Sequence, residues 1–307
     1  MAQPVVLIFH EMLKPLQPAL EAQGWRVALA WEMSDPDRAA ARAIVHNGEH
    51  VLTPEFLGSL PSLGLIANVS VGYDGVDVPW CRSHGIEVTH AKGANADDVA
   101  DHALGLLIAG WRNIVAGDQA VRDGRWRAGG QLARRPGLGG RKLGVVGLGA
   151  IGAAVALRAE ACRMTVAWWG PNAKDAAWPR AAGLLELARD SEILVVCSRA
   201  DASNRGLISR EVIEAVGPQG MIVNVARGAL IDEEALIEAL QAGRLGRAAL
   251  DVFAEEPTPA ERWTDVPNIV LTPHLAGGTA DSVPRMVAQA IDNVRRYFAG
   301  EPVVTPV

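Results

Sequence analysis

Short apolar runs alternate with Ala-, Leu- and Glu-rich segments of helical periodicity along the whole chain. In the first part of the chain, this alternation predicts strands at Val5–Phe9, Arg26–Ala30, Ala43–His46, Leu63–Val69 and Ile86–Thr89. Each predicted strand is followed by a helical or turn-rich segment. That order is typical of a parallel α/β unit.

A longer helical pattern covers Ala94–Asp123, where apolar residues recur at helical spacing. We predict one long helix here, capped by Asn95 and with Asp97 and Asp98 in its first turn, where the helix dipole favours negative charge. The following segment, Gly129–Arg141, is rich in Gly and Arg and predicts a loop.

A second series of apolar runs begins after this loop. Its predicted strands are the segments 143–147, 164–168, 193–197, 221–225, 247–252 and 268–271. Six strands with helices between them predict a complete doubly wound sheet. The amphipathic segment Thr279–Phe298 predicts a last helix that returns to the first lobe. The predicted fold class is α/β, with two doubly wound parallel-sheet lobes.

Length and charge agree with this picture and exclude several function classes. The chain has 307 residues, 21% charged and 49% hydrophobic, with a net charge of −6. Two domains are expected at about one domain per 150 residues. Lys and Arg are not clustered as phosphate binding requires, so we expect no nucleic-acid partner. No run of the chain is apolar enough for a membrane span, so we expect no membrane association.

The three cysteines, Cys81, Cys162 and Cys197, lie far apart, with no CxxC pair and no His at ligand spacing. We interpret them as small buried hydrophobic residues and predict reduced thiols and no metal site. The N-terminus lacks the basic start and cleavage site of a signal peptide. The expected location is therefore the cytoplasm.

The strongest local motif is a GxGxxG pattern that directly follows the apolar strand 143–147 and precedes a predicted helix, Ala153–Glu160. Such glycines permit the tight turn, the approach of the backbone to a pyrophosphate and the close packing of helix on strand. The motif makes residues 95–279 the predicted NAD(P)-binding Rossmann domain, and 1–94 with 280–307 the discontinuous substrate domain. The predicted phosphate contacts are Gly147, Gly149, Ala150, Ile151 and Gly152.

The end of the next strand bears on which dinucleotide is used. An NAD site usually has an acidic residue about 20 residues after the motif, but Gly170 stands there. Without that carboxylate a 2′-phosphate is not repelled, and Asn172 or Lys174 could donate to it. We therefore predict NADP, with NAD as the alternative and with Lys174 as an ordinary solvated residue equally open. The predicted contacts in this segment are Trp169, Gly170, Pro171, Asn172 and Lys174.

Three polar residues follow predicted strand ends, where ligands gather in open α/β sheets: Arg227, Glu256 and His274. Each alone is more often a solvated or structural residue. Together they form the minimum set for reducing a 2-keto acid: a cation for the carboxylate and carbonyl, a proton donor, and a carboxylate that orients it.

The chain resembles the D-isomer-specific 2-hydroxyacid dehydrogenase family, and within it the glyoxylate/hydroxypyruvate reductases. The resemblance covers nearly the whole chain and rests on SVGYDGVD (70–77), VRDGRW (121–126), GVVGLGAIG (144–152), NVARGALIDEEAL (224–236), ALDVFAEEP (249–257) and LTPHLAGG (271–278). It implies that the catalytic residues are Arg227, Glu256 and His274, at the Arg, Glu and His of the family's motifs.

The resemblance also implies roles for these and other residues. Arg227 would bind the substrate carboxylate and polarise its keto oxygen, His274 would protonate the developing alkoxide, and Glu256 would favour the charged imidazole. The backbone amides of Val71 and Gly72 would bind the carboxylate. Val99, Asp251, His274 and Gly277 would lie at the nicotinamide. The remaining cofactor contacts that we expect are Cys197, Ser198, Arg199, Val225 and Ala226.

Several alternatives stay open. Arg199 stands where many family members have Pro, and it either reaches the adenosine or is solvated. Asn47 and Gly48 either form the far wall of the substrate pocket or a plain turn. The substrate could instead be the keto acid of a D-lactate, phosphoglycerate or aryl-pyruvate enzyme using NADH, and a non-catalytic dinucleotide sensor is the alternative of another class. The resemblance implies a homodimer, with Leu104, Leu107 and Ile108 as exposed apolar residues of the long helix.

Overall fold

The computed structural model describes residues 4–126 and 134–307. The chain divides into two compact units. Unit 1 consists of Met1–Asn95 and Ala280–Val307, and unit 2 consists of Ala96–Thr279. Each unit contains one parallel sheet, so the predicted α/β fold class is confirmed. The assignment of substrate to unit 1 and cofactor to unit 2 stays a prediction.

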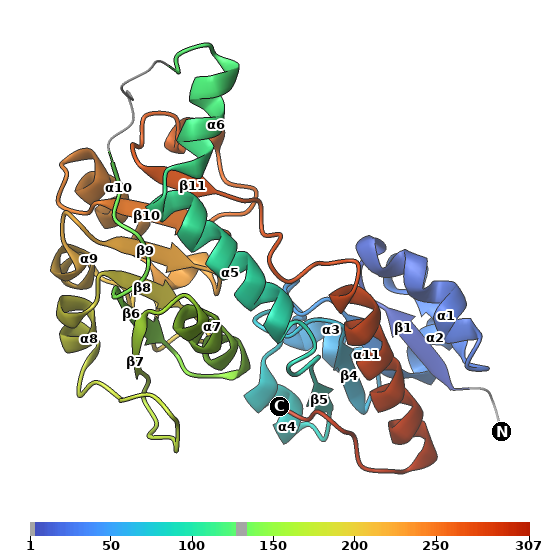
Figure 1. The fold of residues 1–307 in the computed structure, drawn as a ribbon. Coiled ribbons are helices and arrows are strands. Elements are labelled where there is room, and N and C mark those ends of the chain that lie inside the picture. Colours follow the sequence, from blue (N-terminus) through green and yellow to red (C-terminus); the bar gives the residue numbers. More distant parts are fainter. Residues whose placement is uncertain (1–3, 127–133) are drawn as a thin grey trace. The chain divides into compact units, whose positions relative to one another are not determined.

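Unit 1 has a five-stranded sheet in the order β2-β1-β3-β4-β5, of which Figure 1 labels β1, β4 and β5. The central strands are buried on both faces, which explains why they are continuous apolar runs. Its strands are β1 (Val5–Ile8), β2 (Arg26–Leu29), β3 (Ala41–His46), β4 (Leu65–Asn68) and β5 (Glu87–Thr89). Its α-helices are α1 (Gln17–Glu21), α2 (Asp35–Ala40), α3 (Pro54–Gly58), α4 (Val78–Ser83) and α11 (Ser282–Ala299).

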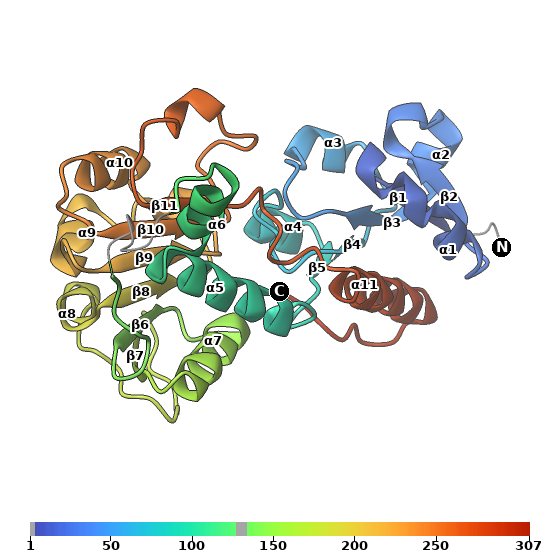
Figure 2. The same cartoon turned by 45° about the horizontal axis from the view of Figure 1, so that its top comes forward.

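The last helix, α11, belongs to unit 1 although it comes at the end of the chain (Figure 2). It packs against β4. Its buried residues Ala290 and Val294 join the core that includes Val6 and Leu65 of the sheet. The amphipathic pattern of the segment therefore reflects a helix that covers one face of this sheet.

Unit 2 has a six-stranded parallel sheet in the order β11-β10-β9-β8-β6-β7. Its strands are β6 (Lys142–Val146), β7 (Thr165–Trp169), β8 (Ile193–Val196), β9 (Met221–Asn224), β10 (Arg247–Leu250) and β11 (Ile269–Leu271). Its α-helices are α5 (Ala96–Trp111), α6 (Ile114–Arg122), α7 (Ala150–Ala161), α8 (Leu184–Asp190), α9 (Arg210–Val216) and α10 (Glu233–Gln241).

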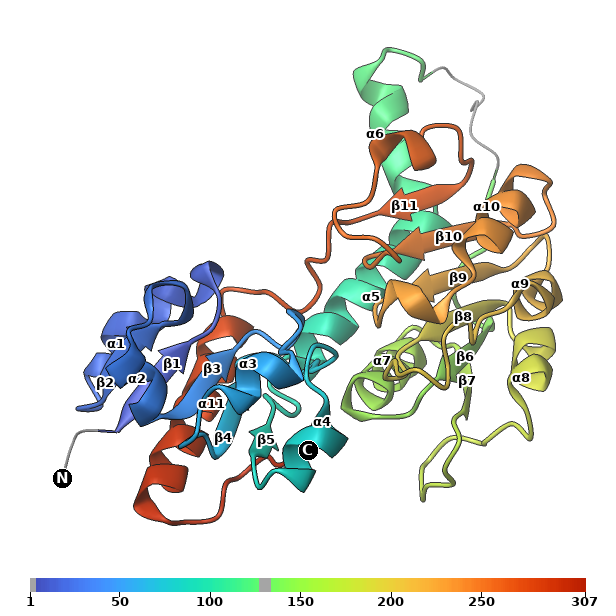
Figure 3. The same ribbon diagram turned by 180° about the vertical axis from the view of Figure 1, so that it is seen from behind.

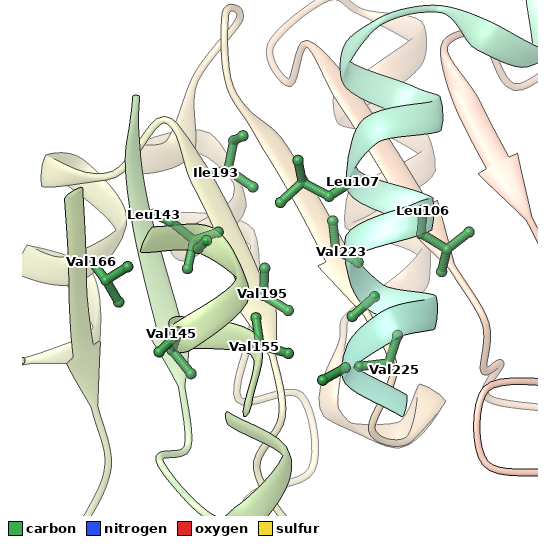
Figure 4. Close-up of a cluster of buried hydrophobic side chains, with 14 of the residues drawn as sticks. Leu106, Leu107, Leu143, Val145, Val155, Val166, Ile193, Val195, Val223 and Val225 are labelled. Carbon is green, nitrogen blue, oxygen red and sulfur yellow. The ribbon is translucent and has the colours of Figure 1, made fainter. Parts of the chain in front are cut away.

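Helices cover both faces of this sheet, and alternate strand residues serve each face. On one face Val145 and Val195 pack with α5 and α7 in a single core (Figure 4). On the other face Val146 and Val196 pack with α8, α9 and α10, which Figure 3 shows from behind. The turn beyond β7 adds a single parallel bridge between Trp168 and Arg180. This isolated bridge lies where the usual dinucleotide fold has a further full strand.

The prediction of one long helix over Ala94–Asp123 is wrong. The structure has two helices, α5 and α6, separated at Asn113, which has a left-handed φ of 55°. This conformation breaks the helical hydrogen-bond ladder, and Asn tolerates it better than most residues. The predicted acidic first turn, Asp97 and Asp98, is confirmed. The predicted cap is not, because Asn95 Oδ1 is buried without a hydrogen bond from any described residue.

Two smaller predictions also change, and a third is confirmed as far as the residues are described. Leu107 is not an exposed apolar residue, because it is 1% exposed and lies in the core between α5 and the sheet (Figure 4). Of the cysteines, Cys81 is buried, and burial raises its pKa to about 11, whereas Cys162 and Cys197 are only partly buried. Part of the predicted loop Gly129–Arg141 lies outside the described residues, and residues 134–141 contain no helix or strand.

Candidate active site

The three predicted catalytic residues come after three neighbouring strands of unit 2. Arg227 follows β9, Glu256 follows β10, and His274 follows β11. These strands are parallel and adjacent, so their carboxyl ends lie at one edge of the sheet. The structure therefore brings these three residues together at one place in unit 2.

The turn that carries Arg227 is held by a buried side chain. Asn224 Nδ2 donates to the Arg227 carbonyl at 2.9 Å, and Asn224 Oδ1 accepts from the amide of Ala226 at 3.1 Å. A Cβ on the next residue, Gly228, would lie 1.8 Å from the carbonyl carbon of Phe253. Only glycine lets this turn pack directly on the segment that leads to Glu256.

Glu256 and His274 form a direct pair. His274 Nδ1 donates to Glu256 Oε2 at 2.7 Å, since a carboxylate can only accept. The other oxygen, Oε1, accepts from the amide of Phe253 at 2.8 Å. Burial alone would raise the pKa of Glu256, but these two hydrogen bonds and the charges of His274 and Arg227 lower it below its usual value. The carboxylate therefore stays ionised and fixes the orientation of the imidazole.

The backbone of His274 has a left-handed φ of 52°, which is uncommon for a residue with a side chain. Three consecutive amides hold this loop to Asp251. The amide of His274 donates to the Asp251 carbonyl at 2.8 Å, and those of Leu275 and Ala276 donate to its carboxylate, each at 2.9 Å. Asp251 is fully buried, and its carboxylate accepts hydrogen bonds from other residues of unit 2. Its predicted contact with the nicotinamide stays a prediction.

A further buried carboxylate supports the segment before Glu256. Glu233, in the first turn of α10, accepts from the amide of Ala254 at 2.5 Å and from Arg262 Nε at 3.2 Å. Burial, the largest effect, raises the pKa of Glu233. The sequence analysis missed Glu233 and Asn224, because their local patterns are those of an ordinary helix start and an ordinary strand end.

The glycine motif forms a tight turn between β6 and α7. Gly147 has φ 93°, and a Cβ there would lie 2.6 Å from the Cα of Ser198. A Cβ on Gly152 would lie 2.1 Å from the Gly147 carbonyl oxygen. At Gly149, by contrast, a Cβ would meet nothing within 4 Å. Two glycines thus close the turn, and the third leaves open space at the start of a twelve-residue helix.

These features fit a dinucleotide. The first amides of α7 have no partner within the helix, and such amides can bind an anion beyond the helix end. Ser198 Oγ, beside Gly147, is buried without a hydrogen-bond partner in the described part of the chain. The predicted contacts Ala150 and Ile151 lie in the first turn of α7.

The segment after β7 is tied to the same turn. Lys174 is exposed, as the solvated alternative expects, and its Nζ also donates to the Leu148 carbonyl at 2.7 Å. Arg180 donates to the Gly170 carbonyl at 2.8 Å and lies over the Trp168 ring. The sequence analysis missed Arg180. Two cations therefore flank the segment in which the acidic residue of an NAD site is missing.

In unit 1, the predicted substrate-binding loop comes after β4. Ser70 Oγ donates to the Gly72 carbonyl at 2.6 Å, and His90 Nδ1 lies 2.9 Å from the Val71 carbonyl oxygen. No acceptor in the described ranges takes a hydrogen bond from the N–H of Val71 or Gly72. A Cβ on Gly48 would lie 2.0 Å from the Gly72 carbonyl oxygen, so the Asn47–Gly48 turn supports this loop directly.

Other predicted contacts are less informative. Val99 and Val225 are buried in the core of unit 2, and Arg199 is exposed, with its carbonyl accepting from Asn204 Nδ2 at 2.8 Å.

Within residues 4–126 and 134–307, no group of three His, Cys, Asp or Glu side chains is placed to hold a metal ion. No helix in those ranges combines the length and apolar character needed to cross a membrane.

Comparison with known proteins gives this geometry a context. Residues 104–276 match the family model of the NAD binding domain of D-isomer specific 2-hydroxyacid dehydrogenases. The chain is 37% identical to glyoxylate/hydroxypyruvate reductase A of Arabidopsis thaliana over 272 residues, 88% of this chain and 86% of that protein. It is 38% identical to hydroxyphenylpyruvate reductase of Plectranthus scutellarioides over 267 residues, 87% and 85% of the two chains.

A solved structure agrees over the whole length. The NADPH-dependent glyoxylate/hydroxypyruvate reductase of Sinorhizobium meliloti, in complex with NADP and malonate, superposes with a TM-score of 0.91. The sequence identity is 31%, and the match covers 100% of this chain and 97% of that chain.

Proposed function

The chain belongs to the D-isomer specific 2-hydroxyacid dehydrogenase family and is an oxidoreductase, and we propose that it reduces glyoxylate and hydroxypyruvate to D-2-hydroxy acids with NADPH. The observation that carries this proposal is the 2.7 Å hydrogen bond between His274 and Glu256, in the field of Arg227. A cation, an oriented imidazole and a carboxylate at one sheet edge are suited to protonating a keto oxygen as its carbon gains a hydride.

Each residue has a defined task. Arg227 binds the substrate carboxylate and polarises the keto oxygen with its planar guanidinium. His274, held by Glu256 at Nδ1, donates a proton from Nε2 to that oxygen. The amides of Val71 and Gly72 bind the carboxylate, as their unpaired N–H groups support. When bound, the nicotinamide supplies the hydride that the keto carbon accepts.

The residues proposed to hold the dinucleotide lie around the turn after β6. The amides of Gly149, Ala150 and Ile151 bind the pyrophosphate, and Ser198 Oγ is a further donor there. We propose NADP over NAD because Gly170 takes the place of an acidic residue and because Lys174 and Arg180 lie beside that segment. NAD remains the alternative cofactor.

Initial rates test the proposal directly. Oxidation of NADPH and of NADH is followed in parallel with glyoxylate, hydroxypyruvate and hydroxyphenylpyruvate. We expect turnover of the two small acids with preference for NADPH. Faster turnover of hydroxyphenylpyruvate would show that the substrate is a larger keto acid than proposed. Preference for NADH would show that the cofactor is NAD and not NADP. No turnover of any keto acid would leave the dinucleotide sensor as the remaining interpretation.

We further propose that the chain forms a homodimer. The support comes from α6 of unit 2, where the apolar residues Ile114, Val115 and Val121 are all more than half exposed. Such a patch on one short helix fits burial against a second copy. Light scattering in solution would test this, and a monomer at micromolar concentration would contradict it. The cytoplasmic location stays a prediction.

A further inference from the structure

A histidine that the proposed mechanism does not use lies close to the His274 loop. His102, on α5, has its Nε2 atom 2.9 Å from Thr272 Oγ1 and 3.2 Å from Asp251 Oδ1. Thr272 Oγ1 is 2.5 Å from the same oxygen of Asp251. The His102 side chain is 25% exposed and that of Asp251 is fully buried, so this triangle joins a helix near the surface to a buried carboxylate.

The donors in this triangle can be assigned. Asp251 accepts the amides of Leu275 and Ala276, which identifies it as an acceptor throughout. The hydroxyl proton of Thr272 therefore points to Asp251, and the Thr272 oxygen accepts from His102. His102 thus carries its proton on Nε2 and donates it to Thr272, while the same nitrogen lies 3.2 Å from Asp251 Oδ1.

The consequence concerns the left-handed backbone of His274. A strained conformation of this kind persists only where the surrounding contacts determine it. Here the contacts come from Asp251, whose carboxylate orientation is in turn fixed by Thr272 and His102. We propose that His102 is a positioning residue, which holds the His274 loop in its reactive conformation through Thr272 and Asp251. The proposal rests on the proposed function for the role of His274.

Two variants and one control test it. His102→Leu removes the N–H donor, while His102→Gln keeps an N–H donor at a similar distance from the backbone. His84→Leu is the control, because it removes another histidine, the C-cap residue that follows α4 in unit 1. We expect His102→Leu to lower kcat by up to about tenfold, the upper end of the effect of one hydrogen bond between neutral groups. The Kd of NADPH and the KM of the keto acid should change less than twofold, and His102→Gln should restore most of kcat.

Amide hydrogen exchange provides a readout that needs no turnover. In His102→Leu, and also in Thr272→Val, exchange at Leu275 and Ala276 should become about tenfold faster, while the strands of the sheet keep their protection. Unchanged exchange at the amides of Leu275 and Ala276 would overturn the proposal. A kcat within twofold of the parent in both His102→Leu and Thr272→Val would also overturn it. If the parent reduces no keto acid, the proposed function fails, and the exchange data still decide whether His102 holds the loop.

Discussion

The two units contain sheets of the same order, but the segments after their equivalent first strands differ. In both sheets, the first strand lies between the second and third, with the fourth and fifth beyond, and the unit 2 sheet adds a sixth strand, β11. After β6, glycines form a tight turn into α7, a helix of twelve residues. After β1, His10 caps a 3-10 helix, Glu11–Leu16, that contains Pro15. The same topology thus builds a dinucleotide-type turn in one unit only, and the residues, not the fold, determine the site.

The carboxyl edges differ in chemistry as well. Unit 2 presents charged and titratable side chains, Arg227, Glu256 and His274, on turns that buried polar residues hold. Unit 1 presents backbone amides on the Val71–Gly72 loop, and its titratable groups at this edge are histidines, His10, His46 and His90, at the ends of β1, β3 and β5. Reaction chemistry should therefore depend on unit 2, and unit 1 should affect mainly how tightly substrate is bound.

The largest expected effect is a loss of kcat in variants that remove a catalytic side chain of unit 2 and leave its fold intact. In His274→Ala or Arg227→Ala, kcat should fall about 10³-fold, because the proton donor or the carboxylate-binding cation is lost. The matched variant in unit 1 is Ser70→Ala, which removes the hydroxyl that holds the Gly72 carbonyl. It should raise KM several-fold with little change in kcat. Steady-state kinetics and the Kd of NADPH separate these outcomes, and full turnover in both unit 2 variants would refute the assignment.

A smaller effect is expected in the turn after β6, where replacing two different glycines should have different consequences for stability. In Gly147→Ala the new methyl would meet the Ser198 backbone at a left-handed φ, so the fold should lose about 3 kcal/mol and NADPH should bind weakly. In Gly149→Ala the methyl meets no protein atom, so Tm should stay within about 1 °C while the Kd of NADPH rises. Thermal unfolding and fluorescence titration measure both. Equal loss of Tm in the two variants would show that Gly149 is structural.

The smallest effect is a pH dependence of unit 2. The pKa of Glu256 is lower in the folded chain, so its ionised form contributes stability above the unfolded value of 4.5. That contribution is lost as pH falls through the lowered folded value. The Tm difference between parent and Glu256→Gln should be roughly 1–2 °C at pH 7 and should shrink below pH 4.5. Glu255→Gln, in the same loop, is the control. A Tm difference that grows on acidification would contradict the predicted direction of the pH dependence.

Much of this organisation could be predicted from the sequence, because it depends on local patterns. Buried parallel strands are continuous apolar runs, and glycine motifs such as 147–152 specify a turn by their backbone requirements. The ends of the helices were predicted less well than the strands and the glycine turn. Asn113 ends α5 through its own conformation, and neither periodicity nor composition signals a single left-handed residue.

The supporting residues could not be predicted for a different reason. His102 meets Thr272 across 170 residues of sequence, and Glu233 meets Ala254 across 21. Such contacts depend on how strands order themselves in the sheet, which no local spacing encodes. The N–H groups of Val71 and Gly72 are likewise visible only once the loop around Gly48 is built.

Isotope transfer tests the central claim most directly. The chain is incubated with hydroxypyruvate and NADPH that carries deuterium at the transferable C4 position, and the product is analysed by mass spectrometry and chiral chromatography. The account predicts D-glycerate with one deuterium at C2, formed about 10³-fold more slowly in Arg227→Ala. Glycerate without deuterium, or of the L configuration, would contradict it.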